Sequence, residues 1–178
     1  MKIFIIVGMP ASGKNLARAY AESKRIPYFA TGDLVRAEVE KRGLDPTSEN
    51  TGRVSTELRG RDGMGVTRLA LAGALQTGEN AVFLEGMRSW PEIELIRQEA
   101  KGVLVAYIAP RETRLQRVAA RGRSDDSPAR FDERDRREIQ YGAAVPIALA
   151  DEYILNTGTM GEAAAALDRI LEKYLQGL

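Results

Sequence analysis

The chain has 178 residues, with 26 lysines and arginines against 25 aspartates and glutamates, and it contains neither cysteine nor histidine. This composition excludes disulfides, thiolate metal sites and imidazole chemistry. The balanced charge gives no reason to expect nucleic acid or an anionic membrane as a partner. Because the length suits one domain with a substantial core, residues 1–178 are expected to form a single domain.

The first predicted element is a strand at residues 3–7, because a short continuous apolar run is typical of a strand buried on both faces of a parallel sheet. Gly8 and Pro10 interrupt the apolar run directly afterwards, which argues against a secretory signal. No apolar segment approaches the roughly 20 residues that a membrane-spanning helix needs. The sequence therefore predicts a soluble, cytoplasmic protein.

Residues 8–15 read GMPASGKN, between this strand and a helix that carries Leu16 and Tyr20 on one face. Phosphate-binding loops follow the pattern G-x-x-x-x-G-K-[ST], in which backbone amides at the positive end of a helix surround the phosphates. The lysine of the pattern reaches the terminal phosphates. We therefore expect ATP as the cofactor, bound through Gly8, Pro10, Ala11, Ser12, Gly13, Lys14, Asn15 and Leu16.

Asn15 departs from the pattern, which places a magnesium-binding hydroxyl at this position. A carboxamide oxygen is a competent ligand, but it lies one bond further out and its NH2 group can donate to a phosphate instead. A second acid is expected at the end of the strand at residues 81–84, where Glu85 follows. Asn15 and Glu85 are therefore the candidate Mg²⁺ ligands, with weakened or water-mediated coordination, and catalytic efficiency is the property that they affect.

The remaining elements alternate between short apolar strands and longer helical patterns, which indicates a three-layer α/β fold. A Thr159 to Glu162 capping box opens the last helix. The charged segment 120–138 lies between two helical patterns, and we interpret it as a mobile insertion that acts as a lid. Further strands are predicted at 27–30, 81–84, 103–108 and 153–155, and further helices between Asp33 and Gly43, at 48–59 and at 63–76.

The segment FATGDLVRAEVEKRG at residues 29–43 resembles the acceptor site of the nucleoside monophosphate kinases, adenylate kinase in particular. It matches their Thr-Gly-Asp-x-x-Arg spacing at the start of a helix. The segment EGMR at residues 85–88 is similar to a shortened form of the family's second arginine segment. The resemblance implies that the acceptor is bound by Thr31, Gly32, Asp33, Arg36, Gly86 and Arg88.

Five motifs together resemble a group of archaeal P-loop kinases related to adenylate kinase and to dephospho-CoA kinase. In chain order they are GMPASGK, GDLVR, EGMRS, RSDD at 123–126 and IALAD at 147–151, so the resemblance spans nearly the whole chain. It implies a five-stranded parallel sheet in the order 2-3-1-4-5. It also implies an acceptor-side helical subdomain at about 32–78 and a short lid at about 121–131.

Phosphoryl transfer requires the protein to position the reactants and to neutralise the charge on the transferred group. The helical spacing of Arg114, Arg117 and Arg121 predicts one face that points toward the lid. Arg88 is expected to bind the acceptor phosphate, and Arg123 and Arg134 the transferred group. The candidate catalytic residues are Lys14, Asp33, Arg88, Arg123 and Arg134.

The sequence leaves the acceptor open between two chemical classes. Thr31, Arg36 and a helix N-terminus favour a nucleoside monophosphate such as AMP, in which case Asp33 orients groups. A hydroxyl acceptor, as in dephospho-CoA kinase, would use Asp33 as the general base. A third alternative, favoured by Asn15, is a nucleotide-binding regulatory protein with little turnover. The expected partners are small nucleotides, the oligomeric state stays open, and Asn156, Thr157 and Gly158 are a candidate adenine contact or a helix cap.

Overall fold

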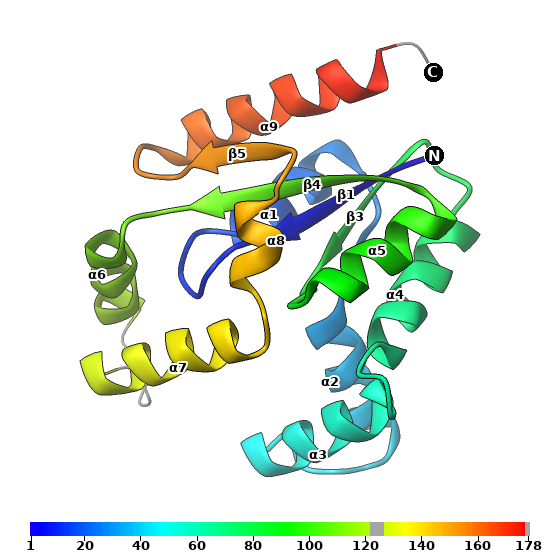
Figure 1. The fold of residues 1–178 in the computed structure, drawn as a ribbon, viewed down its shortest axis with the longest axis vertical. Coiled ribbons are helices and arrows are strands. Elements are labelled where there is room, and N and C mark those ends of the chain that lie inside the picture. The colour runs from blue at the N-terminus through cyan, green and yellow to red at the C-terminus, as the bar shows by residue number, and fades with distance from the viewer. Residues whose placement is uncertain (122–126, 177–178) are drawn as a thin grey trace.

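The computed structural model describes residues 1–121 and 127–176. A parallel sheet of five strands in the order β2-β3-β1-β4-β5 lies at its centre (Figure 1), which confirms the predicted topology. β1 pairs with β3 on one side and with β4 on the other, so that Ile6 lies beside both Glu85 and Val105. The strands are β1 Lys2–Val7, β2 Tyr28–Ala30, β3 Ala81–Glu85, β4 Lys101–Ile108 and β5 Glu152–Leu155.

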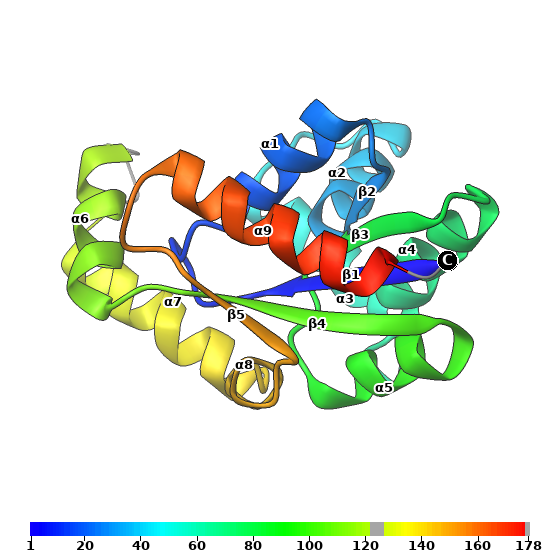
Figure 2. The same ribbon diagram turned by 90° about the horizontal axis from the view of Figure 1, so that it is seen from above.

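Helices cover both faces of the sheet (Figure 2). Successive side chains of a strand point to opposite faces, so each apolar strand packs against helices on both sides. Phe4 and Ile6 pack toward α1 and α9, and Ile3 and Ile5 pack toward α4 and α5 on the other face. The helices are α1 Asn15–Lys24, α2 Thr31–Lys41, α3 Ser48–Arg59, α4 Gly65–Gln76, α5 Trp90–Glu99, α6 Arg111–Arg121, α7 Pro128–Gln140, α8 Ala144–Ala148 and α9 Met160–Leu175.

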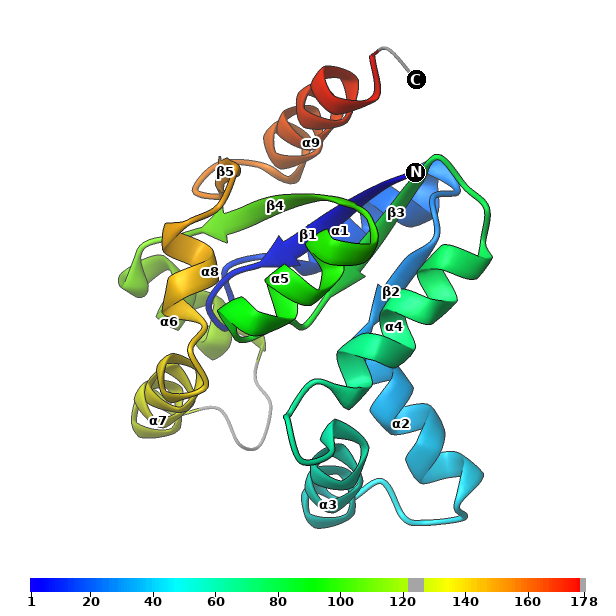
Figure 3. The same ribbon diagram turned by 45° about the vertical axis from the view of Figure 1, so that its right-hand side comes forward.

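Helices α2, α3 and α4 share a small core of their own, built from Val35, Val39, Val54 and Val66. α4 begins at Gly65 rather than at residue 63, because Gly63 has a φ of +76° and the Asp62 carboxylate accepts the Met64 N–H at 3.1 Å. Figure 3 shows α2 and α3 on one side of the strand ends and α6 and α7 on the other. The two groups of helices therefore flank the edge at which parallel strands expose their carboxyl ends.

The charged segment expected to be a mobile insertion at 120–138 is largely helical. α6 ends at Arg121, residues 122–126 lie outside the described part, and α7 begins at Pro128. Ser127 caps α7 by accepting the Arg130 N–H at 3.2 Å, and Phe131 is fully buried. A helix N-cap followed by proline and an apolar anchor explains why so charged a segment folds here.

The last helix, α9, begins as the sequence predicts. Thr159 and Glu162 form the predicted capping box at the start of α9, with the Thr159 hydroxyl accepting the Glu162 N–H at 3.2 Å. Within residues 1–121 and 127–176, no helix combines the length and apolar character needed to cross a membrane.

Candidate active site

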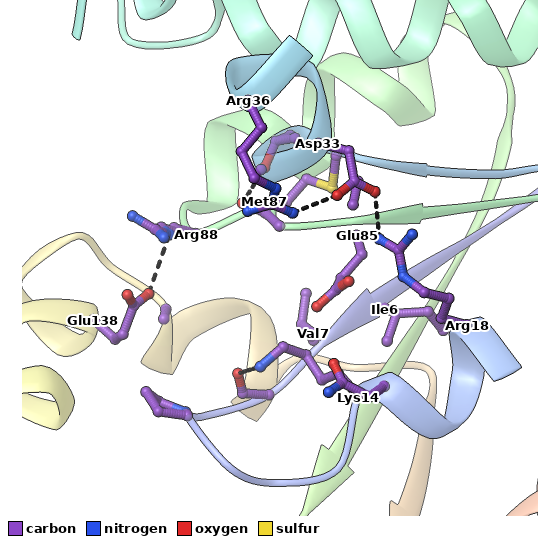
Figure 4. Close-up of a pocket in the computed structure, with 18 of the residues that line it drawn as sticks. Ile6, Val7, Lys14, Arg18, Asp33, Arg36, Glu85, Met87, Arg88 and Glu138 are labelled. Atoms are coloured by element: carbon purple, nitrogen blue, oxygen red, sulfur yellow. Dashed lines mark hydrogen bonds and ion pairs between the residues drawn. The ribbon is translucent and has the colours of Figure 1, made fainter. Parts of the chain in front are cut away.

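A pocket of about 540 Å³ lies at the carboxyl ends of β1, β2 and β3 (Figure 4). The phosphate loop, defined as residues 8–15, forms one side of it, and the start of α2 and the loop after β3 form the other. The charged and polar side chains that line it are Lys14, Asn15, Arg18, Thr31, Asp33, Arg36, Glu85, Arg88, Arg121 and Glu138.

The phosphate loop has a backbone that fits a phosphate group. Gly13 has a φ of +101°, and a Cβ added there would lie 1.9 Å from Asn156 Nδ2. A Cβ on Gly8 would lie 2.5 Å from Ser12 Oγ and 2.6 Å from the Tyr107 carbonyl oxygen. Both glycines are therefore required by the close packing of the loop against its surroundings.

The carbonyl groups of Pro10, Ala11 and Ser12 are bound by side chains that lie behind the loop. Arg114 Nη1 donates to the Pro10 carbonyl at 3.1 Å, and Arg117 Nη1 donates to the Ala11 and Ser12 carbonyls, each at 3.3 Å. Because C=O and N–H point in opposite directions across a trans peptide, the Ala11 and Gly13 amides point away from these arginines. Arg114 and Arg117 of α6 thus support the phosphate loop, while Arg121 of the same helix lines the pocket.

Asn156 lies behind the same loop. Its Nδ2 donates to the Ser12 carbonyl at 2.9 Å, its own carbonyl accepts Arg117 Nη2 at 2.7 Å, and it is 4% exposed. The side chain therefore supports the loop backbone. This contact accounts for its position after β5 better than either adenine binding or helix capping, because Thr159 supplies the cap of α9.

Lys14 turns back onto the loop. Its Nζ donates to the Gly8 carbonyl at 2.7 Å and to the Met9 carbonyl at 3.2 Å. Burial lowers the pKa of Lys14, while the nearby carboxylates of Glu85 and Glu138 act in the opposite direction. A cation held over the inner face of the loop suits a ligand whose anionic oxygens replace the two carbonyl contacts.

Asn15 and Glu85 both line the pocket, as a magnesium site would require. Asn15 is exposed and is the first residue of α1, and Glu85 ends β3 with its Oε2 accepting the Tyr28 hydroxyl at 2.8 Å. The described residues contain no group of three or more acidic, histidine or cysteine side chains that could hold a metal. Magnesium commonly needs only one or two protein ligands when phosphates and water supply the rest, so the pair fits.

Asp33 is held between two arginines where α2 borders the pocket (Figure 4). Arg18 of α1 donates to its Oδ2 at 2.5 Å, and Arg36 donates to its Oδ1. Burial alone would raise the pKa of Asp33, but the hydrogen bonds from Arg18 and then Arg36 outweigh it, so the pKa lies below 3.8. The Asp33 carboxylate is therefore a weak proton acceptor and a good organiser of the two guanidinium groups.

Arg88 approaches the pocket from the loop after β3. Its Nε lies 3.2 Å from Glu138 Oε2 of α7, and its guanidinium lies 5.3 Å from the centre of the Tyr141 ring. Gly86 allows this loop to approach α2, since it has a φ of +103° and a Cβ there would lie 2.1 Å from Thr31 Oγ1. Thr31 is buried and donates to the Gly86 carbonyl at 3.4 Å, so it holds the loop that carries Arg88.

Glu92 of α5 holds the loop that carries Arg88 through hydrogen bonds to its backbone. Its side chain is 2% exposed, and its Oε2 accepts the Arg88 N–H at 2.8 Å, the Ser89 N–H at 2.9 Å and the Ser89 hydroxyl at 2.9 Å. Its Oε1 accepts the Thr67 hydroxyl of α4 at 2.6 Å. This carboxylate of α5 therefore ties the backbone of Arg88 to both α5 and α4.

Glu92→Ala is expected to lower the free energy of unfolding by about 3 kcal/mol, because buried donors at Arg88, Ser89 and Thr67 would lose their acceptor. Urea denaturation with an unchanged m-value measures this loss. Glu94→Ala is the matched control, since Glu94 is an exposed residue of the same helix, and it is expected to cost less than about 1 kcal/mol. Equal losses in both variants would contradict the assigned role of Glu92.

The pocket brings together most of the residues that the sequence nominates. Ala11, Ser12 and Gly13 belong to the loop without being among the lining residues, and Leu16 packs on the core beside α9. Arg134 lies on α7 and is absent from the described lining, and Arg123 lies outside the described residues. The charged lining side chains that the sequence did not nominate as site residues are Arg18, Arg121 and Glu138.

Comparison with known proteins places this site in a family. A family model described as an AAA domain matches residues 7–132. A UPF0200 protein of Methanosarcina acetivorans is 41% identical over 181 residues, which cover 99% of this chain and 97% of that protein.

Solved structures agree on the fold. TT1252 from Thermus thermophilus superposes with a TM-score of 0.67 at 21% identity, covering 96% of each chain. Shikimate kinase from Acinetobacter baumannii, in complex with shikimate, superposes with a TM-score of 0.57 at 18% identity, covering 98% of this chain and 92% of that one. The protein therefore has the fold of the P-loop kinases, and it belongs to the UPF0200 family.

Proposed function

We propose that the protein is a cytoplasmic kinase that transfers a phosphoryl group from ATP, with Mg²⁺, to a small nucleotide-like acceptor, a nucleoside monophosphate such as AMP. The observation that carries this proposal is the single pocket shared by the phosphate loop and the acceptor-side arginines. Lys14 lies on one side of it, and Arg36 and Arg88 lie on the other. Two anion-binding groups facing one another across one volume suit transfer between two phosphates.

The charges on the acceptor side favour a phosphate over a hydroxyl acceptor. A hydroxyl acceptor needs a general base, but Asp33 is ionised and already accepts from Arg18 and Arg36. A phosphate acceptor is itself anionic and needs cations instead, which these two arginines and Arg88 provide. The acceptor-side residues would thus bind and orient, with no proton to remove.

Each part of the pocket has a separate task in this proposal. The loop amides and Lys14 would hold the phosphates of ATP, and Asn15 and Glu85 would hold the ion, which supplies neutralisation of phosphate charge. Arg88 would bind the acceptor phosphate, and Arg121, which also lines the pocket, is a candidate for the charge of the transferred group. Arg123 and Arg134 remain the sequence-based candidates for that last task.

The test is ADP release from ATP across a magnesium titration, with AMP, other nucleoside monophosphates or dephospho-CoA as acceptor. We expect magnesium-dependent release that a nucleoside monophosphate stimulates. Asn15→Ser, run in parallel, is expected to lower the magnesium concentration needed for half-maximal release, because the shorter hydroxyl is the usual ligand. ATP binding without stimulated release in the wild type would assign the protein to nucleotide binding alone, and stimulation only by dephospho-CoA would assign it a hydroxyl acceptor.

A further inference from the structure

An ion pair behind the phosphate loop joins α6 to α7. Arg114 Nη1 and Nη2 donate to the two carboxylate oxygens of Asp135 at 2.7 and 2.6 Å. The two side chains are 8% and 14% exposed. The same Nη1 also donates to the Pro10 carbonyl of the loop at 3.1 Å. One guanidinium group therefore contacts both helices and the phosphate loop.

An aromatic ring of α7 also lies against this guanidinium. The centre of the Phe131 ring, which is fully buried, lies 5.0 Å from the Arg114 guanidinium carbon. Phe131 and Asp135 are four residues apart on α7, so they share one face of that helix. The ring and the carboxylate of α7 both contact Arg114, so α7 holds the guanidinium where one N–H group reaches the Pro10 carbonyl.

The peptide that Arg114 holds is next to a strained residue. Ala11 has a φ of +59°, in the left-handed region that a residue with a Cβ rarely adopts. Such a conformation persists only where the surroundings impose it. Arg114 binds the carbonyl before Ala11, and Arg117 binds the carbonyl of Ala11 itself at 3.3 Å. These contacts keep the Ala11 amide pointing away from the arginines.

Stability alone gives no reason for a charged pair at this place. Replacing a buried ion pair with apolar side chains of similar size is often neutral or stabilising, since both charges lose their hydration when buried. An apolar pair could hold α6 against α7 equally well. The one contact that it could not replace is the donor to the Pro10 carbonyl.

We propose that the Arg114–Asp135 pair is a positioning device that holds the strained phosphate loop in its nucleotide-binding conformation. The proposal rests on the nucleotide binding that the proposed function requires. Neither residue lines the pocket in the described structure, so their effect passes through the loop backbone.

The test compares two paired substitutions between the same two helices. Arg114→Met with Asp135→Leu removes the buried pair. Arg111→Met with Asp132→Leu removes an ion pair that joins α6 and α7 at the surface, where the side chains are 54% and 40% exposed. Titration calorimetry with ADP is expected to give about a tenfold weaker affinity for the first variant and wild-type affinity for the second, with both thermal midpoints near that of the wild type.

Adding Ala11→Gly to the first variant separates positioning from simple loss of packing. Glycine adopts the left-handed region without strain, so the triple variant is expected to recover most of the lost ADP affinity. If the apolar pair prevents folding, Arg114→Lys replaces it, because one ammonium group cannot span the carboxylate and the Pro10 carbonyl as the fork does. Unchanged ADP affinity in a folded variant, or a loss that Ala11→Gly does not reduce, would overturn the proposal.

The ADP affinities measured by calorimetry do not depend on whether the protein transfers a phosphoryl group. A wild type that binds ADP but transfers no phosphoryl group would contradict the proposed function, and the calorimetry would still decide the role of the pair. A wild type that binds no ADP would contradict both.

Discussion

Lys14→Ala is expected to lower kcat for ADP formation by about a thousandfold, because one preorganised charge on a transferring phosphoryl group contributes on that scale. The ammonium group is held over the inner face of the loop by the Gly8 and Met9 carbonyls. In the proposed reaction it would exchange these contacts for phosphate oxygens. Steady-state kinetics with saturating ATP and acceptor measures the change.

The Lys14 variant is expected to keep its fold, which makes the kinetic loss interpretable. Burial lowers the pKa of Lys14 below 10.5, so its charged form is less favourable in the folded chain than in the unfolded one. Removing the ammonium group removes this cost of burial but also the two hydrogen bonds to the Gly8 and Met9 carbonyls, so the thermal midpoint is expected to stay near that of the wild type. Lys101→Ala, at an exposed position at the start of β4, is the control and is expected to leave kcat within about twofold. Comparable losses in both variants would contradict the assignment of Lys14.

The sheet could be predicted from the sequence because its strands carry a strong local signal. Residues 3–7 and 103–108 are continuous apolar runs, which few elements other than buried strands contain at this length. The capping box at Thr159 was equally local, and the structure contains it. By contrast, the sequence did not predict α7, because Phe131 is the one buried residue of this described helix and the start of the helix depends on the Ser127 cap.

The site was predictable where a motif has a fixed spacing along the chain. The phosphate loop and the segment from Thr31 to Arg36 are of this kind, and both line the pocket. Arg18 and Glu138 were not predictable, because a single charged residue on a helix has the pattern of a solvated face. Only the packing of α1 and α7 around the strand ends turns these side chains toward the pocket.

Two further features of the site were not predicted, although the sequence contains a signal for each. Ser89 and Glu92 have the spacing of a capping box, which is sufficient to predict an N-cap and so the anchoring of the Arg88 backbone. The spacing of Arg114 and Arg117 predicted a shared helix face, but spacing cannot say what that face contacts. The structure shows that it contacts the loop carbonyls of Pro10 and Ala11, which lie close to α6 only in the folded sheet.

Arg88→Ala is expected to lower kcat/KM for the acceptor by about a hundredfold and to leave ADP affinity unchanged. The guanidinium reaches the acceptor side of the pocket and can bind a phosphate through two parallel hydrogen bonds. The phosphate loop does not include it, so nucleotide binding should be unaffected. Acceptor kinetics at saturating ATP and calorimetry with ADP measure the two quantities separately.

Two further variants distinguish recognition of the acceptor from loss of charge or of fold. Arg88→Lys keeps the charge but loses the planar fork, so kcat/KM for the acceptor is expected to fall by an intermediate factor. Arg169→Ala removes an exposed arginine of α9, which lies over the sheet away from the pocket, and should change neither quantity.

Glu138 contacts Arg88 in the wild type, so the acceptor phosphate must compete with the Glu138 carboxylate for the Arg88 guanidinium. Glu138→Gln weakens this competition and is therefore expected to lower the KM of the acceptor, whereas an unchanged KM in every Arg88 and Glu138 variant would place the acceptor elsewhere.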